Sequence, residues 1–145
     1  MMKKTIQIIS FVLLLIYVAA VGFLCLMEPD NIPSVTFDLF GLPVDKVAHF
    51  TMFFPYPILV WFSINHERLR SRGKQALMLA GILVLGAGLA ILTEYLQKLT
   101  GYRTFDLNDF YADLIGMGLC GLILLAGILF KHQTSKKKVY PCSEK

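Results

Sequence analysis

The sequence predicts an all-α, polytopic membrane protein built as a bundle of four transmembrane helices, and three observations lead to this fold class. Hydrophobic residues make up 56% of the 145-residue chain, above the roughly 45–50% typical of soluble domains. They gather in four apolar runs, each about long enough to cross a bilayer. Lysine and arginine gather at alternate ends of successive runs, a pattern that places both chain ends in the cytoplasm, an N-in/C-in topology.

The charge distribution supports a membrane protein rather than a nucleic-acid-binding one. The net charge of +4 comes from basic clusters that flank the expected spans, so we interpret them as topology signals that contact membrane lipids. No aromatic-interleaved basic patch or zinc-finger spacing points to nucleic acid. The three cysteines lack metal-type spacing. We expect Cys25 and Cys120 to pack as small apolar residues and Cys142 to lie in the cytoplasmic tail.

The first expected span, residues 5–27, follows a basic start and resembles a signal peptide in outline. Its apolar stretch is longer than a typical signal sequence, so we favour an uncleaved helix over cleavage after Gly22. The segment from Glu28 to Lys46 carries three prolines and several acids. We expect it to form a loop on the outer side of the membrane.

The second expected span covers residues 47–64. Asp45 lies where a helix N-cap would be expected, just after Pro43. Pro55 and Pro57 fall inside the span, and proline removes a backbone donor and clashes with the preceding turn. The sequence therefore predicts a kink or break near Phe54–Pro57.

The third and fourth expected spans cover residues 76–97 and 112–130. Small residues recur at helical spacing in both, with Gly86 four residues before Ala90 and Gly116 four residues before Cys120. Such spacing lets neighbouring helices approach closely. We therefore expect residues 1–131 to form one membrane domain and residues 132–145 to form a basic, disordered cytoplasmic tail.

Polar residues from three segments reach the same edge of the membrane in this topology. Ionisable groups at or within a span are costly, so they usually pair with one another or serve a site. Asp45 and His49 are four residues apart, as are Asp109 and Asp113, so each pair shares a helix face. The predicted polar cluster consists of Asp45, Lys46, His49, Glu94, Gln97, Arg103, Asp106, Asp109 and Asp113.

Several of these residues also have purely structural interpretations. Asp106 fits a cap for the fourth helix, and Lys46 fits an interfacial anchor. The cluster as a whole fits an ion-pair network that holds three helices together. Arg103 fits a phosphate clamp, and the candidates for catalysis are His49, Glu94 and Asp109. We expect no cofactor and no metal, because the acids and the histidine match no recognised metal motif.

At these residues the chain resembles the VanZ-like family of small membrane proteins. The matching pieces are Asp45-Lys46-x-x-His49-Phe50, Glu94-x-x-Gln97, and Arg103-x-Phe105-Asp106-x-x-Asp109 leading into Gly116. Asp113 stands where the family usually has Asn. The resemblance implies a multi-helix membrane protein, and the family's namesake is associated with low-level resistance to the glycopeptide teicoplanin. It implies no catalytic role for any residue.

The sequence leads to a multi-pass protein of the bacterial inner (cytoplasmic) membrane with a polar site on the outer side. We expect this site to bind or organise an envelope lipid, a glycan precursor or a glycopeptide, and to contribute to teicoplanin resistance. Membrane lipids are then the expected partners, with no nucleic acid and with no protein partner identified. One alternative is an intramembrane enzyme that acts on a lipid-linked phosphate, and another is a structural or assembly partner.

Overall fold

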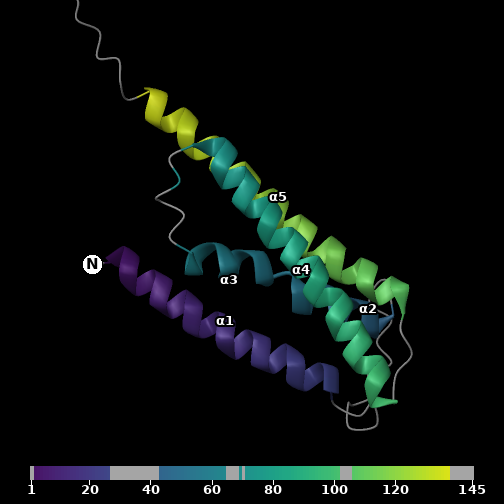
Figure 1. The fold of residues 1–145 in the computed structure, drawn as a ribbon. Helices are drawn as coiled ribbons and strands as arrows, with labels where there is room; N and C mark the ends of the chain where they lie inside the picture. Colours follow the sequence, from purple (N-terminus) through teal and green to yellow (C-terminus); the bar gives the residue numbers. More distant parts are fainter. Residues whose placement is uncertain (1, 27–42, 65–68, 70, 102–105, 138–145) are drawn as a thin grey trace, which may run out of the picture.

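The described part of the chain forms five helices that run back and forth along one bundle (Figure 1). The computed structural model describes residues 2–26, 43–64, 69, 71–101 and 106–137, and these residues form helices and no strand. The all-α fold class is therefore confirmed. The helices are α1 (Met2–Leu26), α2 (Val44–Phe53), α3 (Tyr56–Ser63), α4 (Arg72–Thr100) and α5 (Leu107–Lys137).

Three of these helices are long and apolar enough to cross a membrane. The segments are Lys4–Cys25 in α1, Arg72–Thr100 in α4 and Leu107–Phe130 in α5. The chain is therefore a multi-pass membrane protein. The fourth expected crossing corresponds to α2 and α3, neither of which is long enough to span a bilayer alone.

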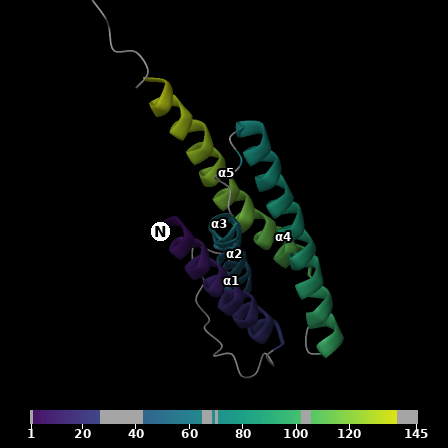
Figure 2. The same ribbon diagram turned by 60° about the vertical axis from the view of Figure 1, so that its left-hand side comes forward.

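The direction of the chain alternates from one long segment to the next. Figure 1 shows the end of α1, the start of α2, the end of α4 and the start of α5 at one end of the bundle. The chain start and the end of α5 lie toward the other end. Figure 2, turned by 60°, also shows the end of α5 far from the end of α4. This arrangement is compatible with four crossings, whereas the side of the membrane that each end faces stays a prediction.

The second expected span is broken, as its prolines predict. Helix α2 ends at Phe53, and α3 begins at Tyr56 with Pro55 before it and Pro57 in its first turn. Each proline lacks the backbone N–H that would continue the α-helical ladder. The Tyr17 hydroxyl of α1 donates a hydrogen bond to the Met52 carbonyl beside the break. A side chain from a neighbouring helix thus satisfies backbone where the ladder is interrupted.

Two helix boundaries differ from the sequence-based expectation. Helix α2 begins at Val44 after Pro43, and no side chain caps it, so Asp45 lies in the first turn and is not the N-cap. Helix α5 passes the expected end near residue 130 and continues to Lys137, so this part of the expected disordered tail is helical. The extension contains lysine and glutamine, which are good helix formers even where the chain is no longer apolar.

Helix α5 is the centre of the bundle, and glycines bring its neighbours close. It packs against α2 and α4, whereas α1 packs chiefly against α3. A Cβ added to Gly116 would lie 2.5 Å from the Phe50 carbonyl oxygen of α2, and one added to Gly86 would lie 2.5 Å from Met117 Sδ. These contacts confirm that the small residues mark helix–helix interfaces. The described residues include a buried apolar cluster that comprises Phe53, Tyr56, Trp61, Leu79, Ile82, Ala90, Met117 and Ile128.

Two cysteines contribute to this packing. Cys25 and Cys120 are both buried, as expected of small apolar residues. The third, Cys142, lies outside the described residues. Neither described cysteine belongs to a group of side chains with metal-binding geometry among the described residues.

Candidate functional site

The polar residues predicted from three segments come together where α2, α4 and α5 meet. Five of them are almost completely withdrawn from solvent, with relative exposures of 6% or less. They are His49 on α2, Glu94 and Gln97 on α4, and Asp109 and Asp113 on α5. Burial at this level is unusual for ionisable groups, which are costly to desolvate unless they are paired. We call His49, Glu94, Asp109 and Asp113 the buried cluster.

His49 is the central side chain of the buried cluster. Its Nδ1 atom lies 3.1 Å from Asp113 Oδ1, within hydrogen-bonding distance. Its other ring nitrogen, Nε2, lies 3.8 Å from Glu94 Oε1 and 3.9 Å from Asp109 Oδ2. The imidazole therefore lies between three carboxyl groups from two other helices. Gly116 of α5 approaches the backbone of Phe50 in α2 closely. Since Phe50 follows His49 and Asp113 lies one turn before Gly116, this approach brings His49 and Asp113 together.

Lys46 pairs with the acids at the start of α5. Its Nζ atom donates to Asp109 Oδ1 at 2.8 Å and to Asp106 Oδ2 at 3.1 Å. Its side chain is 28% exposed, so the pairing is only partly screened by solvent. These contacts connect Lys46 to Asp106 and Asp109 of the predicted polar cluster, and its alternative role as an interfacial anchor stays a prediction.

Asp106 caps α5, as the sequence predicts. Its Oδ1 atom accepts a hydrogen bond of 2.8 Å from the Asn108 backbone N–H, two residues into the helix. This bond, and next the Lys46 ammonium, hold the pKa of the Asp106 carboxyl below its ordinary value. Asp106 therefore stays ionised at neutral pH, where it both caps the helix and binds Lys46.

Glu94 connects the buried cluster to the α4–α5 connection. Its Oε2 atom accepts a hydrogen bond of 3.2 Å from the Asp106 backbone N–H. Its Oε1 atom faces His49 Nε2. One carboxylate thus contacts both the start of α5 and the imidazole of α2, so the three helices share a single polar junction.

Three buried polar atoms find no hydrogen-bond partner among the described residues: His49 Nε2, Glu94 Oε1 and Asp113 Oδ2. Most buried polar atoms in proteins are satisfied, so each such atom calls for a physical explanation. The arrangement is suited to moving a proton between His49 and an acid. It is equally suited to holding a cation between a nitrogen and carboxylate oxygens.

Three residues of the predicted polar cluster remain: Asp45, Gln97 and Arg103. The Asp45 carboxylate brings an oxygen within 4.8 Å of ligand atoms of His49 and Asp109, so it belongs to the same junction. Gln97 is buried, and its backbone carbonyl accepts the Thr100 hydroxyl. Arg103 lies outside the described residues.

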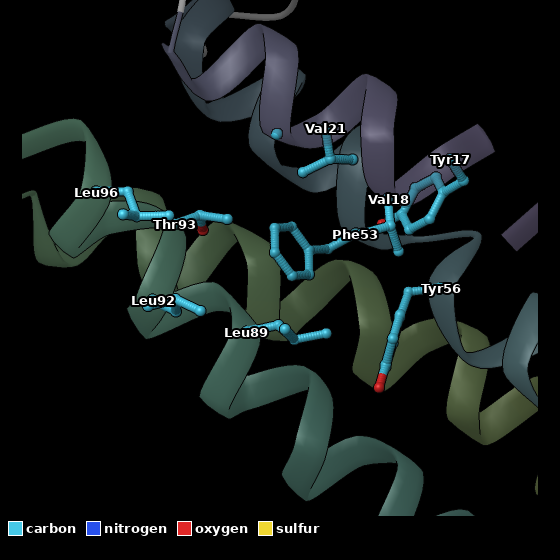
Figure 3. A pocket seen from close by; sticks show the side chains of 10 residues that line it. Tyr17, Val18, Val21, Phe53, Tyr56, Leu89, Leu92, Thr93 and Leu96 are labelled. Atoms are coloured by element: carbon cyan, nitrogen blue, oxygen red, sulfur yellow. The ribbon is translucent and has the colours of Figure 1, made fainter. Parts of the chain in front are cut away.

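An apolar cavity of about 160 Å³ lies beside the junction. Figure 3 shows the Phe53 ring projecting into the space between α1 and α4, with Val21 on one side and Leu92 on the other. Thr93 and Leu96, next in sequence to Glu94 and Gln97, also line it. The sequence carries no sign of this cavity, because its lining is indistinguishable from ordinary membrane-facing residues.

Two comparisons with known proteins identify relatives. A family model described as VanZ/LLP1 matches residues 2–131. The fission yeast (Schizosaccharomyces pombe) protein named "Uncharacterized protein C11E3.10" is similar to this chain, with 35% identity over 136 residues, which cover 93% of this chain and 69% of the yeast protein. No solved structure matches.

Proposed function

The chain belongs to the VanZ/LLP1 family, and we propose that it is a multi-pass membrane protein that binds a membrane lipid beside its polar junction. The observation that carries this proposal is the apolar cavity of about 160 Å³, which adjoins the helix turns that bear His49 and Glu94. An acyl chain in the cavity would place a lipid headgroup near the polar end of the bundle.

The lining of the cavity favours an acyl chain over a polar ligand. It consists of aliphatic and aromatic side chains together with Gly22 and Thr93. An apolar cavity of about 150 Å³ stays dry and accepts a benzene-sized group. Within a membrane, the acyl chain of a phospholipid is the most abundant group of this kind. At the polar end, the partly exposed Lys46 ammonium offers a charge to a headgroup phosphate.

We propose that this end faces the outer side of the bacterial cytoplasmic membrane, with both chain ends inside. Three features support this orientation: the basic residues gather at the opposite ends of the spans, the long helices alternate in direction, and lysine and arginine favour the cytoplasmic side. Reporter fusions at residues 70 and 105 test it. We expect residue 70 inside and residue 105 outside, and the reverse result would contradict the proposed orientation.

The similarity to a fission yeast protein favours a phospholipid over a glycan precursor or a glycopeptide, because phospholipids are common to bacterial and eukaryotic membranes. A contribution to teicoplanin resistance is a separate part of the proposal. It predicts that His49→Ala and Arg103→Ala change glycopeptide sensitivity of a host that expresses the correctly inserted protein. Unchanged glycopeptide sensitivity would contradict the proposed role in teicoplanin resistance but would not affect the proposal of lipid binding.

Lipid binding is tested by blocking the cavity. Gly22 lines the cavity, and a Cβ added there would meet no atom within 4 Å, so Gly22→Leu should fill the space without disturbing the helix. We expect phospholipid retention in native mass spectrometry to fall at least about fourfold, the equivalent of one buried methylene. Gly88→Leu is the matched control, because Gly88 is equally open but does not line the cavity. Equal retention by both variants would overturn the proposal.

A second candidate is an intramembrane enzyme that acts on a lipid-linked phosphate. The observation that favours it is the position of His49 between Asp113 and Glu94, which resembles a base with an orienting acid and a nearby proton donor. Turnover of a labelled lipid phosphate by the purified protein, lost in Glu94→Gln, would support it. If Asp109→Asn lowered stability in detergent and changed neither binding nor turnover, a purely structural role would be supported instead.

A further inference from the structure

We propose that His49 Nε2, together with the carboxylates of Glu94 and Asp109, binds a divalent transition-metal ion. This inference reverses the expectation from the sequence, which contains no recognised metal motif. It is independent of lipid binding, because it depends on the buried cluster and not on the apolar cavity. The observation behind it is that His49 Nε2 and Glu94 Oε1 are fully buried and find no partner among the described residues.

The separations from His49 Nε2 suit ligands that share an ion with it. This atom lies 3.8 Å from Glu94 Oε1 and 3.9 Å from Asp109 Oδ2. These distances are too long for hydrogen bonds. Ligands of a tetrahedral ion with bonds of about 2.0–2.2 Å lie about 3.3–3.6 Å apart. Ligand atoms lie within 4.8 Å of one another in two sets that share His49, one with Glu94 and Asp113 and one with Asp45 and Asp109. Glu94 and Asp109 belong to different sets, so an ion held on Nε2 takes both carboxylates only after both side chains close on it.

Asp113 orients the imidazole for metal binding. An ionised carboxylate only accepts hydrogen bonds, so with Asp113 ionised its contact with His49 Nδ1 requires the proton of a neutral imidazole to be on Nδ1. In the neutral ring, the lone pair of Nε2 then points toward the Glu94 and Asp109 carboxylates. Three electron-rich atoms would face one another without a cation. Metal-binding histidines commonly donate their second ring N–H to a carboxylate in this way.

The charge balance of the junction also favours a cation. Lys46 binds Asp109 through Oδ1, whereas Oδ2 is the oxygen nearest the histidine. Asp45 brings a further carboxylate oxygen within 4.8 Å of ligand atoms of His49 and Asp109. When Glu94, Asp109 and Asp113 are ionised, their buried negative charge exceeds the single charge of Lys46, and a doubly charged ion would offset the difference.

The mixed ligand set selects the kind of metal. One imidazole nitrogen with carboxylate oxygens suits zinc or manganese, whereas magnesium and calcium prefer oxygen ligands alone. Three protein ligands leave a position open, and Asp45 or a water molecule is the nearest group of suitable chemistry to occupy it.

Zinc binding by the purified full chain tests the proposal. The protein in detergent is stripped with a chelator and dialysed against buffered Zn²⁺, and bound metal is measured by mass spectrometry. We expect close to one zinc ion per chain, lost in His49→Gln and in Glu94→Gln. Asp113→Asn should bind about 10–100-fold more weakly, because a neutral amide oxygen supports the ligating imidazole less strongly than a carboxylate does. Lys98→Gln is the matched control and should bind normally, since Lys98 is an exposed residue of α4, the helix that bears Glu94.

Spectroscopy distinguishes a variant that has lost a metal ligand from a variant that has failed to fold. Co²⁺ bound to the wild-type protein should show visible absorption of a mixed nitrogen and oxygen site, and Asp113→Asn should shift this spectrum while its helix content stays unchanged. Wild-type protein that retains less than about one zinc per ten chains would overturn the proposal. So would wild-type affinity in a folded Glu94→Gln variant. If Arg103 neutralises the cluster instead, the wild type binds no zinc, and that result also overturns the proposal.

Discussion

The two sides of the bundle are built by different means. Where α2, α4 and α5 meet, ionisable side chains are buried, and Gly116 lets two backbones touch. Along α1, only 11% of the apolar span is buried, and a cavity separates part of it from α4. The first region depends on specific residues at specific positions, whereas the second depends on general apolar character.

This difference separates residues whose identity matters, at the polar junction, from residues along α1 that need only be apolar. Most apolar residues of α1 face outward, where lipid is as favourable a neighbour as another helix. The buried cluster has no such substitute, because an unpaired ionisable group has no favourable environment within the membrane. The most damaging substitutions should therefore concentrate at the polar junction.

The largest expected effect follows from removal of Asp113. Asp113→Leu leaves His49 Nδ1 buried without its partner, and breaking a buried pair in this way costs about 3–5 kcal/mol. The unfolding free energy of the purified protein in mixed detergent measures this loss. Asp113→Asn retains an oxygen that accepts from His49, so its loss should be much smaller. Equal losses in both variants would show that this contact does not distinguish the junction from the rest of the bundle.

A smaller effect is expected from Gly116→Val, which tests the contact between α2 and α5. The new side chain would press on the Phe50 carbonyl oxygen, and overpacking of this kind costs about 1–3 kcal/mol. Gly118→Val provides the comparison, because a Cβ there meets no atom within 4 Å. The same unfolding measurement should show a loss for the first variant only. A tolerated Gly116→Val would contradict the close approach of the helices.

The smallest effect should come from the α1 side. Tyr17→Phe removes the hydrogen bond to the Met52 carbonyl at the helix break, and such bonds within membrane proteins average about 0.6 kcal/mol. Tyr95→Phe should change nothing measurable, because Tyr95 is 53% exposed. A loss of stability in Tyr17→Phe larger than that in Gly116→Val would reverse the contrast between the two sides.

The sequence predicts much of this architecture because its signals are local. Apolar runs predict the three long helices, and Pro55 and Pro57 predict the break between α2 and α3. Helical spacing predicts that Asp109 and Asp113 share a face. Alternation of the chain direction predicts that His49, Glu94 and these acids reach one level of the bundle. Each inference uses only the residues of one segment and the order of segments.

The sequence does not predict which polar side chains touch. Rotation of each helix about its axis decides whether His49 pairs with Asp113 or with Glu94, and that rotation depends on packing at Gly116 and Gly86. The sequence places Lys46 in the polar cluster but does not predict its partners, which lie 60 and 63 residues away. The hydropathy pattern underestimates the length of α5, because an apolar run shows only where the membrane span ends. The helix itself can continue into water.

The broken α2–α3 segment has a consequence for the order of assembly in the membrane. Synthesis proceeds from the N-terminus, so His49 enters the membrane before α4 and α5 exist. Its hydrogen-bond partner Asp113 follows 64 residues later. We expect α2 and α3 to be inserted early but to reach their final position last, after the α4–α5 hairpin provides the acids. Biogenesis of this protein should therefore be most vulnerable in the interval between synthesis of α2 and synthesis of α5, when the histidine has been made and its acids have not.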